Sequence, residues 1–237
     1  MLVILFFSPK IQATCIIVIS TSDTIYIAID TRVYNINSIK NINYLTTTSK
    51  LIKFEKLIAT YSGINEYENI NIDSIIINSL QAYKTFEERT SNMTLNIFKA
   101  LEVLSKNKNF TKLAFSIKDT ISIMPIVAEI INGKSRIYRL ECSLYKKITG
   151  EYEISYRKYT FPQSMTDKFL SFCVGGEKAI IEYIIENPSL PFYTDPVRVL
   201  KILMKIAIQN DCMCGYPIDI CRLTSKSIDI QRYNEGD

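Results

Sequence analysis

The stretch of the chain best suited to chemistry is residues 12–20 (QATCIIVIS), where Ala13 and Thr14 precede a run with strong β-strand character. If proteolysis removes residues 1–13, Thr14 becomes a first residue with both a hydroxyl nucleophile and a free α-amine. An α-amine titrates at about 7.7–8.0 and can serve as a general base at neutral pH. The sequence contains no histidine, which excludes Ser-His-Asp and Cys-His catalysis. A self-activated N-terminal nucleophile is therefore one of the few hydrolase designs open to this chain.

Residues 1–13 differ from the rest of the chain. Residues 2–7 (LVILFF) form a short apolar run, Pro9 can end a helix after it, and Ala13 suits the position before a signal-peptidase cut. We expect residues 1–13 to be a signal peptide or propeptide and residues 14–237 to form one domain. A signal peptide implies export to the periplasm or the cell exterior, and its absence implies a cytoplasmic protein. The alternative is a first β-strand that stays attached, or a start codon assigned too early.

Composition excludes several classes of function. The net charge of +4 is spread along the chain without a basic cluster, so we expect no nucleic-acid partner. No stretch reaches the length of about 20 apolar residues that spans a bilayer, so we expect no stable membrane insertion. We also expect no cofactor and no metal, because the chain lacks histidine and paired CxxC spacing. The six cysteines are interpreted as disulfide partners after export or as small buried hydrophobes. They are Cys15, Cys142, Cys173, Cys212, Cys214 and Cys221.

The first half of the chain predicts strands followed by helices. Residues 14–21 and 24–32 predict a hairpin, and residues 50–63 predict two short strands around a turn near Glu55 that end at Gly63. Helical spacing over residues 72–106 predicts two helices separated at residues 90–92.

The second half repeats this order. Strands are predicted over residues 120–131 and 135–145, joined by the hairpin dipeptide Asn132-Gly133, and over residues 151–161. Residues 169–186 predict a strand, Gly175-Gly176 and a helix, and a second helix runs from Asp195-Pro196 to about Gln209. Strands over residues 216–224 and 227–233 end the chain. Two facing sheets with a helix pair on each outer side satisfy this order, so we predict an α+β fold with four αββα layers.

The ordered set of motifs resembles proteasome β-type subunits and their bacterial relatives, members of the N-terminal-nucleophile (Ntn) hydrolase superfamily. A strand starts at a threonine, IDTR follows with its aspartate sixteen residues on, and a lysine introduces the next strand pair. A glycine then ends that pair, and two helices, a late Gly-Gly helix and a D-x-x-C-G motif complete the set. The resemblance covers residues 14–230, and its specificity lies in the order of the motifs.

The resemblance implies roles for three polar residues and a glycine. Thr14 matches the nucleophile, Asp30 the family's buried aspartate, and Lys50 the lysine beside the threonine hydroxyl. The Asp30 carboxylate would hold the Lys50 ammonium, which would lower the cost of a developing alkoxide. Gly63 matches the glycine whose backbone N–H faces the developing oxyanion, with one residue fewer than usual between it and Lys50.

Three further positions surround the nucleophile's amine in the resemblance. Asp211 matches the aspartate near the amine. Cys214 stands where the family usually has a serine, and Val174 stands where a second serine is expected before Gly175-Gly176. Because both family serines hydrogen-bond around the amine, this chain departs from the pattern at the position of the general base.

The sequence thus predicts an amidohydrolase or peptidase that attacks an amide carbonyl through Thr14 and passes through an acyl-enzyme resolved by water. Its expected partners are a peptide or amide substrate and further copies of itself. One alternative is a catalytically inactive proteasome-like subunit with a structural or binding role, which retention of residues 1–13 would favour. Another is an acylase or amidase for a small substrate. Taken singly, Asp30 also fits a turn and Lys50 a solvated strand edge.

Overall fold

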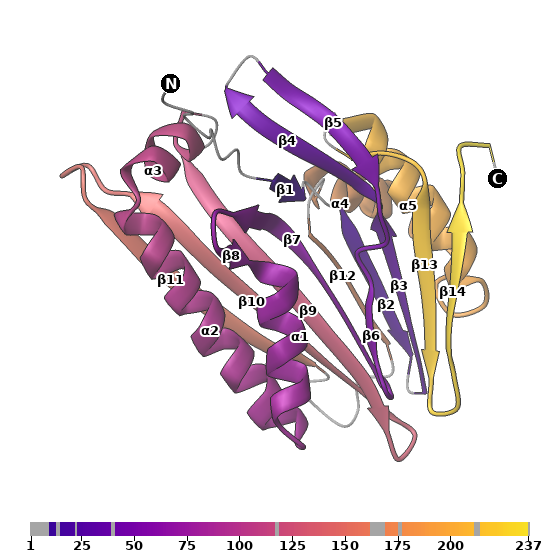
Figure 1. Ribbon diagram of the computed structural model, residues 1–237. Helices are drawn as coiled ribbons and strands as arrows, with labels where there is room; N and C mark the ends of the chain where they lie inside the picture. Colours follow the sequence, from indigo (N-terminus) through magenta and orange to yellow (C-terminus); the bar gives the residue numbers. More distant parts are fainter. Residues whose placement is uncertain are drawn as a thin grey trace.

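The computed structural model describes residues 10–12, 15–21, 23–38, 41–116, 119–161, 169–174, 177–210 and 214–236. These residues build four layers in the order helices, sheet, sheet, helices (Figure 1). Both sheets are antiparallel. The predicted α+β, αββα architecture is confirmed.

The smaller sheet has five strands in the order β12-β2-β3-β13-β14. Its central strands, β2 (Ile16–Thr21) and β3 (Thr24–Asp30), form the hairpin that the sequence predicts. The other three are β12 (Phe169–Val174), β13 (Ile218–Thr224) and β14 (Ile228–Tyr233).

Two helices cover the outer face of the smaller sheet. They are α4 (Glu177–Glu186) and α5 (Pro196–Asn210). Asp195 caps α5 as predicted, because its carboxylate accepts a hydrogen bond from Arg198 N at 3.1 Å. The apolar side of α5 packs on Ile17, Ala28 and Ile220 of the sheet.

The larger sheet has nine strands, seven of them in the order β11-β10-β9-β7-β1-β4-β5, while β6 and β8 also pair with β7. Their bounds are β1 (Lys10–Gln12), β4 (Arg32–Ser38), β5 (Asn41–Thr47), β6 (Ile52–Phe54), β7 (Leu57–Tyr67), β8 (Ile70–Asn71), β9 (Thr120–Ile131), β10 (Lys134–Lys146) and β11 (Tyr152–Phe161). The predicted Asn132-Gly133 turn is confirmed, with positive φ angles of 52° and 71°. Strand β7 continues past its predicted end at Gly63, and strands β4 and β5 were not predicted.

The first two helices over the larger sheet span residues 72–106 as predicted, but the break between them is displaced. The break between α1 (Ile72–Ala82) and α2 (Phe86–Lys106) lies at residues 83–85, so the predicted break at residues 90–92 is wrong. Thr85 and Glu88 form a capping box that starts α2. Thr90 lies inside the helix, where its hydroxyl donates to Phe86 O at 2.9 Å. A short unpredicted helix, α3 (Lys108–Ala114), follows.

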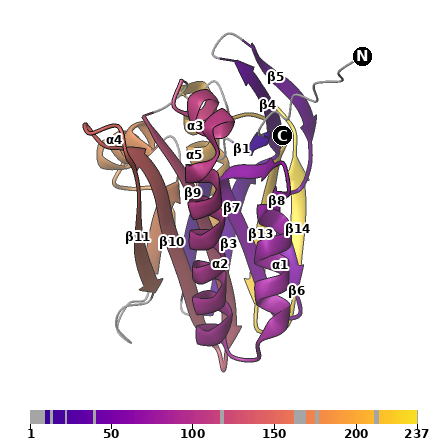
Figure 2. The same cartoon turned by 60° about the vertical axis from the view of Figure 1, so that its left-hand side comes forward.

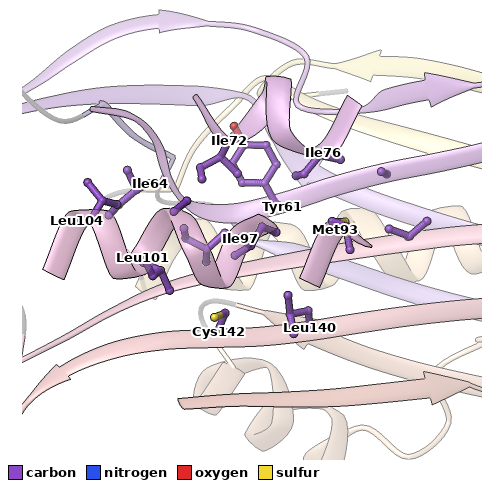
Figure 3. Close-up of a cluster of buried hydrophobic side chains, with 14 of the residues drawn as sticks. Tyr61, Ile64, Ile72, Ile76, Met93, Ile97, Leu101, Leu104, Leu140 and Cys142 are labelled. Atoms are coloured by element: carbon purple, nitrogen blue, oxygen red, sulfur yellow. The ribbon is translucent and has the colours of Figure 1, made fainter. Parts of the chain in front are cut away.

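Three apolar cores hold the four layers together. One lies between the larger sheet and α1, α2 and α3, and Figure 3 shows Tyr61 and Ile64 of β7 packed there with Ile72 and Ile76 of α1. A second fills the space between the sheets, and a third lies under α4 and α5. Figure 2 shows α1 and α2 in front of the strands. Within the described part of the chain, no helix is long and apolar enough to cross a membrane.

Candidate active site

The candidate site lies where the chain passes from the smaller sheet into the larger one. Asp30 is the last residue of β3, and Arg32 is the first residue of β4. Lys50 follows the end of β5, and Thr48 N donates to Thr31 O at 2.9 Å to close the base of the β4–β5 hairpin. Strands β4 and β5 therefore lead away from the crossing and back to it, which brings Lys50 next to Asp30.

Asp30 and Lys50 form a buried ion pair. Lys50 Nζ lies 3.3 Å from Asp30 Oδ2, and both side chains are 0% exposed. The structure thus brings together two of the predicted site residues. Lys50 is not the solvated strand-edge lysine of the alternative interpretation.

Asp30 also holds the backbone beside the predicted nucleophile. Its Oδ1 accepts a hydrogen bond from Cys15 N at 2.8 Å, and its Oδ2 accepts one from Arg32 N at 3.3 Å. Cys15 is the residue directly after Thr14. One carboxylate therefore connects the start of the first long strand, the lysine and the crossing between the sheets.

Burial and the ion pair act in opposite directions on the two pKa values. Burial raises the pKa of Asp30 to about 6, against the effect of Lys50 and of the N–H groups of Cys15 and Arg32. Burial lowers the pKa of Lys50, against the effect of Asp30 and, more weakly, of the Cys214 and Cys15 thiols. Each charge thus depends on the other to remain ionised.

Gly63 occupies a position where no side chain fits. It has a φ of +119°, and a Cβ atom there would lie 2.1 Å from the backbone oxygen of Ser122 in β9. Gly63 lies in β7 opposite Gln12 of β1, two residues before Thr14 in the sequence. Close packing of β7 against β9 therefore requires a glycine at this position.

Residues 214–217 contact Thr31 and Arg32, where the chain crosses between the sheets. Arg32 Nε donates to Tyr216 O at 3.3 Å, and Thr31 donates to Pro217 O from its backbone N at 3.1 Å and its hydroxyl at 2.8 Å. Gly215 lies against the Arg32 guanidinium, since a Cβ atom there would be 2.1 Å from Arg32 Cζ. Sequence reasoning did not assign roles to Thr31 and Arg32, although both belong to the IDTR motif.

The remaining predicted site residues are Thr14, Asp211 and Cys214. Thr14 and Asp211 lie outside the described residues, as does the side chain of Val174. Cys214 is described and buried, with 2% of its surface exposed. Among the residues with described positions, no group of three or more cysteine, aspartate or glutamate side chains could hold a metal ion.

The two facing antiparallel sheets and their outer helices have a proteasome-like fold, which is shared by solved structures that include the following two. Anbu (ancestral beta-subunit) from Yersinia bercovieri matches with a TM-score of 0.56 and 16% identity, over 94% of this chain and 87% of that one. The Anbu (Gly-1) mutant from Hyphomicrobium sp. strain MC1 matches with a TM-score of 0.56 and 12% identity, over 94% and 88%.

The predicted resemblance is therefore confirmed at the level of the fold. Comparison with protein-family models gives no match, and comparison with curated protein sequences gives none either.

Proposed function

We propose that this protein is an N-terminal threonine amidohydrolase that cleaves peptides through Thr14 after removal of residues 1–13. The observation that carries the proposal is the fully buried Asp30–Lys50 pair, joined through Asp30 to the N–H of Cys15. Burying an ion pair costs free energy, so a role in packing alone does not explain why this pair is present. Its place beside the residue that follows Thr14 fits a role in catalysis.

The chemistry needs few groups. The hydroxyl oxygen of Thr14 attacks the substrate carbonyl carbon, and the hydroxyl proton passes to the α-amine of the same residue. The Lys50 ammonium favours the developing alkoxide, and a backbone N–H at Gly63 would stabilise the oxyanion. As the tetrahedral intermediate collapses, the C–N bond breaks and the leaving amine takes the proton. Water, deprotonated by the α-amine, then hydrolyses the ester and releases the acid.

The pairing of β1 supports a peptide as the substrate. Residues 10–12 run antiparallel to both β7 and β4, with Gln12 opposite Gly63. The space between these strands thus accepts an extended backbone that leads toward the site. A peptide in place of β1 would pair with both strands through its main chain, which is a recurring mode of peptide recognition. A small amide would lack these contacts.

The same pairing also favours the second candidate, an inactive subunit with a structural or binding role. Strand β1 lies in the interior of the larger sheet rather than on its edge. In a chain that keeps residues 1–13, β1 would fill the space between β7 and β4. The nitrogen of Thr14 would then belong to a peptide bond and could not act as a free amine.

The deciding experiment measures the mass of the N-terminus and its reactivity. Protein from the native host should begin at Thr14, and a peptide β-lactone should acylate it once, on Thr14. Thr14→Ala should abolish the adduct, and Cys15→Ala should leave it in place. A chain that begins at Met1, or an adduct on Cys15, would contradict the proposed mechanism.

We further propose that the protein forms a homo-oligomer. The Yersinia bercovieri protein of the same fold is described as an ancestral beta-subunit, which supports assembly of this chain as well. Light scattering coupled to size-exclusion chromatography measures the mass in solution. The mass of a single chain, which is 27.3 kDa before residues 1–13 are removed, would contradict the proposal.

A further inference from the structure

Strand β11 forms one edge of the larger sheet. It pairs with β10 in unbroken register over its whole length, from Tyr152 opposite Lys146 to Phe161 opposite Ile137. Within the described part of the sheet no strand pairs with its other side, and Figure 2 shows it at the margin of the sheet. A long, regular strand edge without proline or a bulge is ready to pair with another strand. The edge of β11 is therefore a surface to which a further strand can be added.

The hairpin between β10 and β11 determines which backbone groups face this edge. Lys147 N donates to Glu151 O at 2.7 Å, so these two residues form a hydrogen-bonded pair. Such pairs alternate along an antiparallel ladder, so the odd-numbered residues from 153 onward direct their N–H and C=O groups to β10. The backbone groups of the even-numbered residues from 152 to 160 face the open edge, where a second strand can bond to them.

The charges along β11 favour a second copy of the same strand as the partner. When two identical strands pair about a two-fold axis perpendicular to the sheet, side chains on the same face lie opposite each other. With the axis at Ser155, Glu153 of each copy lies opposite Arg157 of the other. An axis at Arg157 places like charges opposite each other, and an axis at Tyr156 leaves both charges opposite uncharged residues. An axis nearer the hairpin turn overlaps fewer residues of β11.

Glu153 is accessible for this contact. Its carboxylate pairs with Lys147 Nζ at 2.6 Å, and both side chains are 43% exposed. An exposed ion pair is weak, and a carboxylate accepts hydrogen bonds at both of its oxygens. Ser155 and Arg157 are exposed as well. The Glu153 carboxylate can therefore bind Arg157 of a second copy without losing Lys147.

Apolar side chains on the helix-covered face support the same register. Tyr156 packs edge-to-face on Phe98 of α2, with ring centroids 6.1 Å apart, and 51% of its surface is still exposed. With the axis at Ser155, Tyr156 of each copy lies opposite Ile154 of the other. Pairs of an aromatic and a β-branched side chain stabilise antiparallel strands. The exposed surface of Tyr156 would thus be covered.

Helix α2 extends this apolar surface past the edge of the sheet. Thr94 bonds to Tyr138 of β10, and Phe98 contacts Tyr156 of β11. Because successive helical residues are about 100° apart, Thr94, Phe98 and Leu95 follow one another around the helix in that order. Leu95 therefore overhangs the edge of β11, and 51% of its surface is exposed.

We propose that β11 is the interface between two copies of this chain, which pair β11 with β11 antiparallel about a two-fold axis at Ser155. The two larger sheets then form one continuous sheet, and the isologous contact closes on itself as a dimer. This inference rests on the homo-oligomer proposed above and specifies its contact. The contact needs neither processing at Thr14 nor the reaction, so the acylation assay does not bear on it.

A cysteine at the axis tests the register. The two Ser155 residues would form a non-hydrogen-bonded pair with Cα atoms about 4.5 Å apart, within the range of a disulfide. Ser155→Cys should therefore give a covalent dimer as oxidised glutathione is reduced to two molecules of glutathione. Arg157→Cys, two residues from the axis on the same face, and the wild-type chain are the controls. Both should run as monomers on a denaturing gel without reductant. No dimer from Ser155→Cys, or an equal yield from Arg157→Cys, would overturn the proposal.

Charge reversal tests the pairing without a new bond. Arg157→Glu and Glu153→Arg each place like charges opposite each other, so each variant alone should dimerise at least about tenfold more weakly. A mixture of the two variants should form a heterodimer with nearly the wild-type Kd, because every charge at the contact then meets its opposite. Lys158→Glu makes the same change in net charge on the other face of β11 and should leave the Kd nearly unchanged.

Light scattering over a dilution series measures these dissociation constants. No recovery in the mixture, or an equal loss from Lys158→Glu, would contradict the register. A wild-type chain that stays monomeric would overturn both this interface and the homo-oligomer. An oligomer without the Ser155→Cys cross-link would overturn this interface alone.

Discussion

Cys15 and Asp30 exchange two hydrogen bonds, one from Cys15 N to Asp30 Oδ1 at 2.8 Å and one from Asp30 N to Cys15 O at 3.3 Å. The backbone beside Thr14 is therefore fixed to the same residue that pairs with Lys50. The Asp30 side chain thus couples the position of the predicted nucleophile to the charge of Lys50. Changes at Asp30 should consequently affect both stability and reactivity.

The first prediction concerns the buried pair. Lys50→Met leaves a buried carboxylate without its cation, and Asp30→Asn leaves a buried ammonium without its anion. Each should lower the free energy of unfolding by about 3–5 kcal/mol. The double variant should lose less than the sum of the two, because neither charge remains. Denaturant unfolding measures all three, and strictly additive losses would show that the two charges do not interact.

The second prediction is a pH profile for single-turnover acylation by a peptide β-lactone. Asp30 must be ionised to hold the Lys50 ammonium, and its pKa is raised from 3.8 to about 6. The α-amine, which titrates at about 7.7–8.0, must be neutral. Below pH 6 both the Asp30 carboxyl and the α-amine are protonated, and each must lose its proton before the reaction. A plot of the logarithm of the rate against pH should therefore approach a slope of two in this range. On the alkaline side the rate should fall again as the Lys50 ammonium loses its proton. Because the pKa of Lys50 is lowered from 10.5, this fall should have its midpoint at a pH below 10.5.

The control for this profile is Asp30→Asn, which removes one titrating group. It should be at least about a hundredfold slower, in line with the loss of a group that stabilises the transition state, and should keep only the slope of one from the amine. A wild-type slope of one down to pH 4 would show that Asp30 does not titrate in the reaction.

The third prediction compares two glycines with positive φ. Gly63→Ala places a Cβ 2.1 Å from Ser122 O, whereas Gly133→Ala, at a φ of +71°, meets nothing within 4 Å. We expect Gly133→Ala to cost about 1–2 kcal/mol, the strain of a left-handed alanine. Gly63→Ala should cost clearly more, because strands β7 and β9 must also separate. Thermal unfolding of the two variants measures the difference, and equal costs would contradict the close packing at Gly63.

How far the sequence predicted this fold depends on where the pairing partners lie. Alternating strands joined by a tight turn, such as those at Asn132-Gly133, contain their own partners and were predicted correctly. Strands β4 and β5 were not, because asparagine is unfavourable in strands and β4 pairs with β1, in a segment interpreted as removable. The start of α2 is predicted too late because the polar residues 90–92 favour a break, although Thr85 and Glu88 form a T-x-x-E capping signal.

The site was predicted unevenly for a related reason. No local pattern brings Asp30 to Lys50, since their contact requires the β4–β5 excursion between them. Their proximity was expected only from the resemblance in motif order. Arg32 was overlooked because its partners, Gly215 and Tyr216, lie in a loop far along the chain.

The fourth prediction concerns Arg32, which holds the loop that contains Cys214. Arg32→Lys removes the Nε donor to Tyr216 O and the flat group that lies against Gly215. We expect a loss of about 1 kcal/mol in unfolding free energy, the usual value of one hydrogen bond, and slower acylation. Arg222→Lys, at an exposed position in β13, should change neither. Acylation at the wild-type rate in Arg32→Lys would show that the loop position does not affect the site.

The last prediction concerns the thiol of Cys214, at the position where the resemblance to proteasome β-type subunits predicts a serine. Cys214 is buried in the apolar core with Cys15 and Ile218, and its thiol favours the charged form of Lys50. A hydroxyl is a stronger hydrogen-bonding group than a thiol, so Cys214→Ser should orient the α-amine at least as well. Acylation by the β-lactone should then be unchanged or faster, and Asp211→Asn should slow it sharply.

Cys221→Ser is the matched control. Cys221 is also buried, and burial raises its thiol pKa to about 12, but it packs in the core between the two sheets. Both serine variants bury a hydroxyl, and each should lose about 1–3 kcal/mol of stability unless that hydroxyl finds a partner. Cys221→Ser should leave the acylation rate unchanged, so that any increase is confined to Cys214→Ser. Strong inactivation by Cys214→Ser, with Cys221→Ser fully active, would show that the thiol itself serves the reaction, and the role assigned to the α-amine would have to be abandoned.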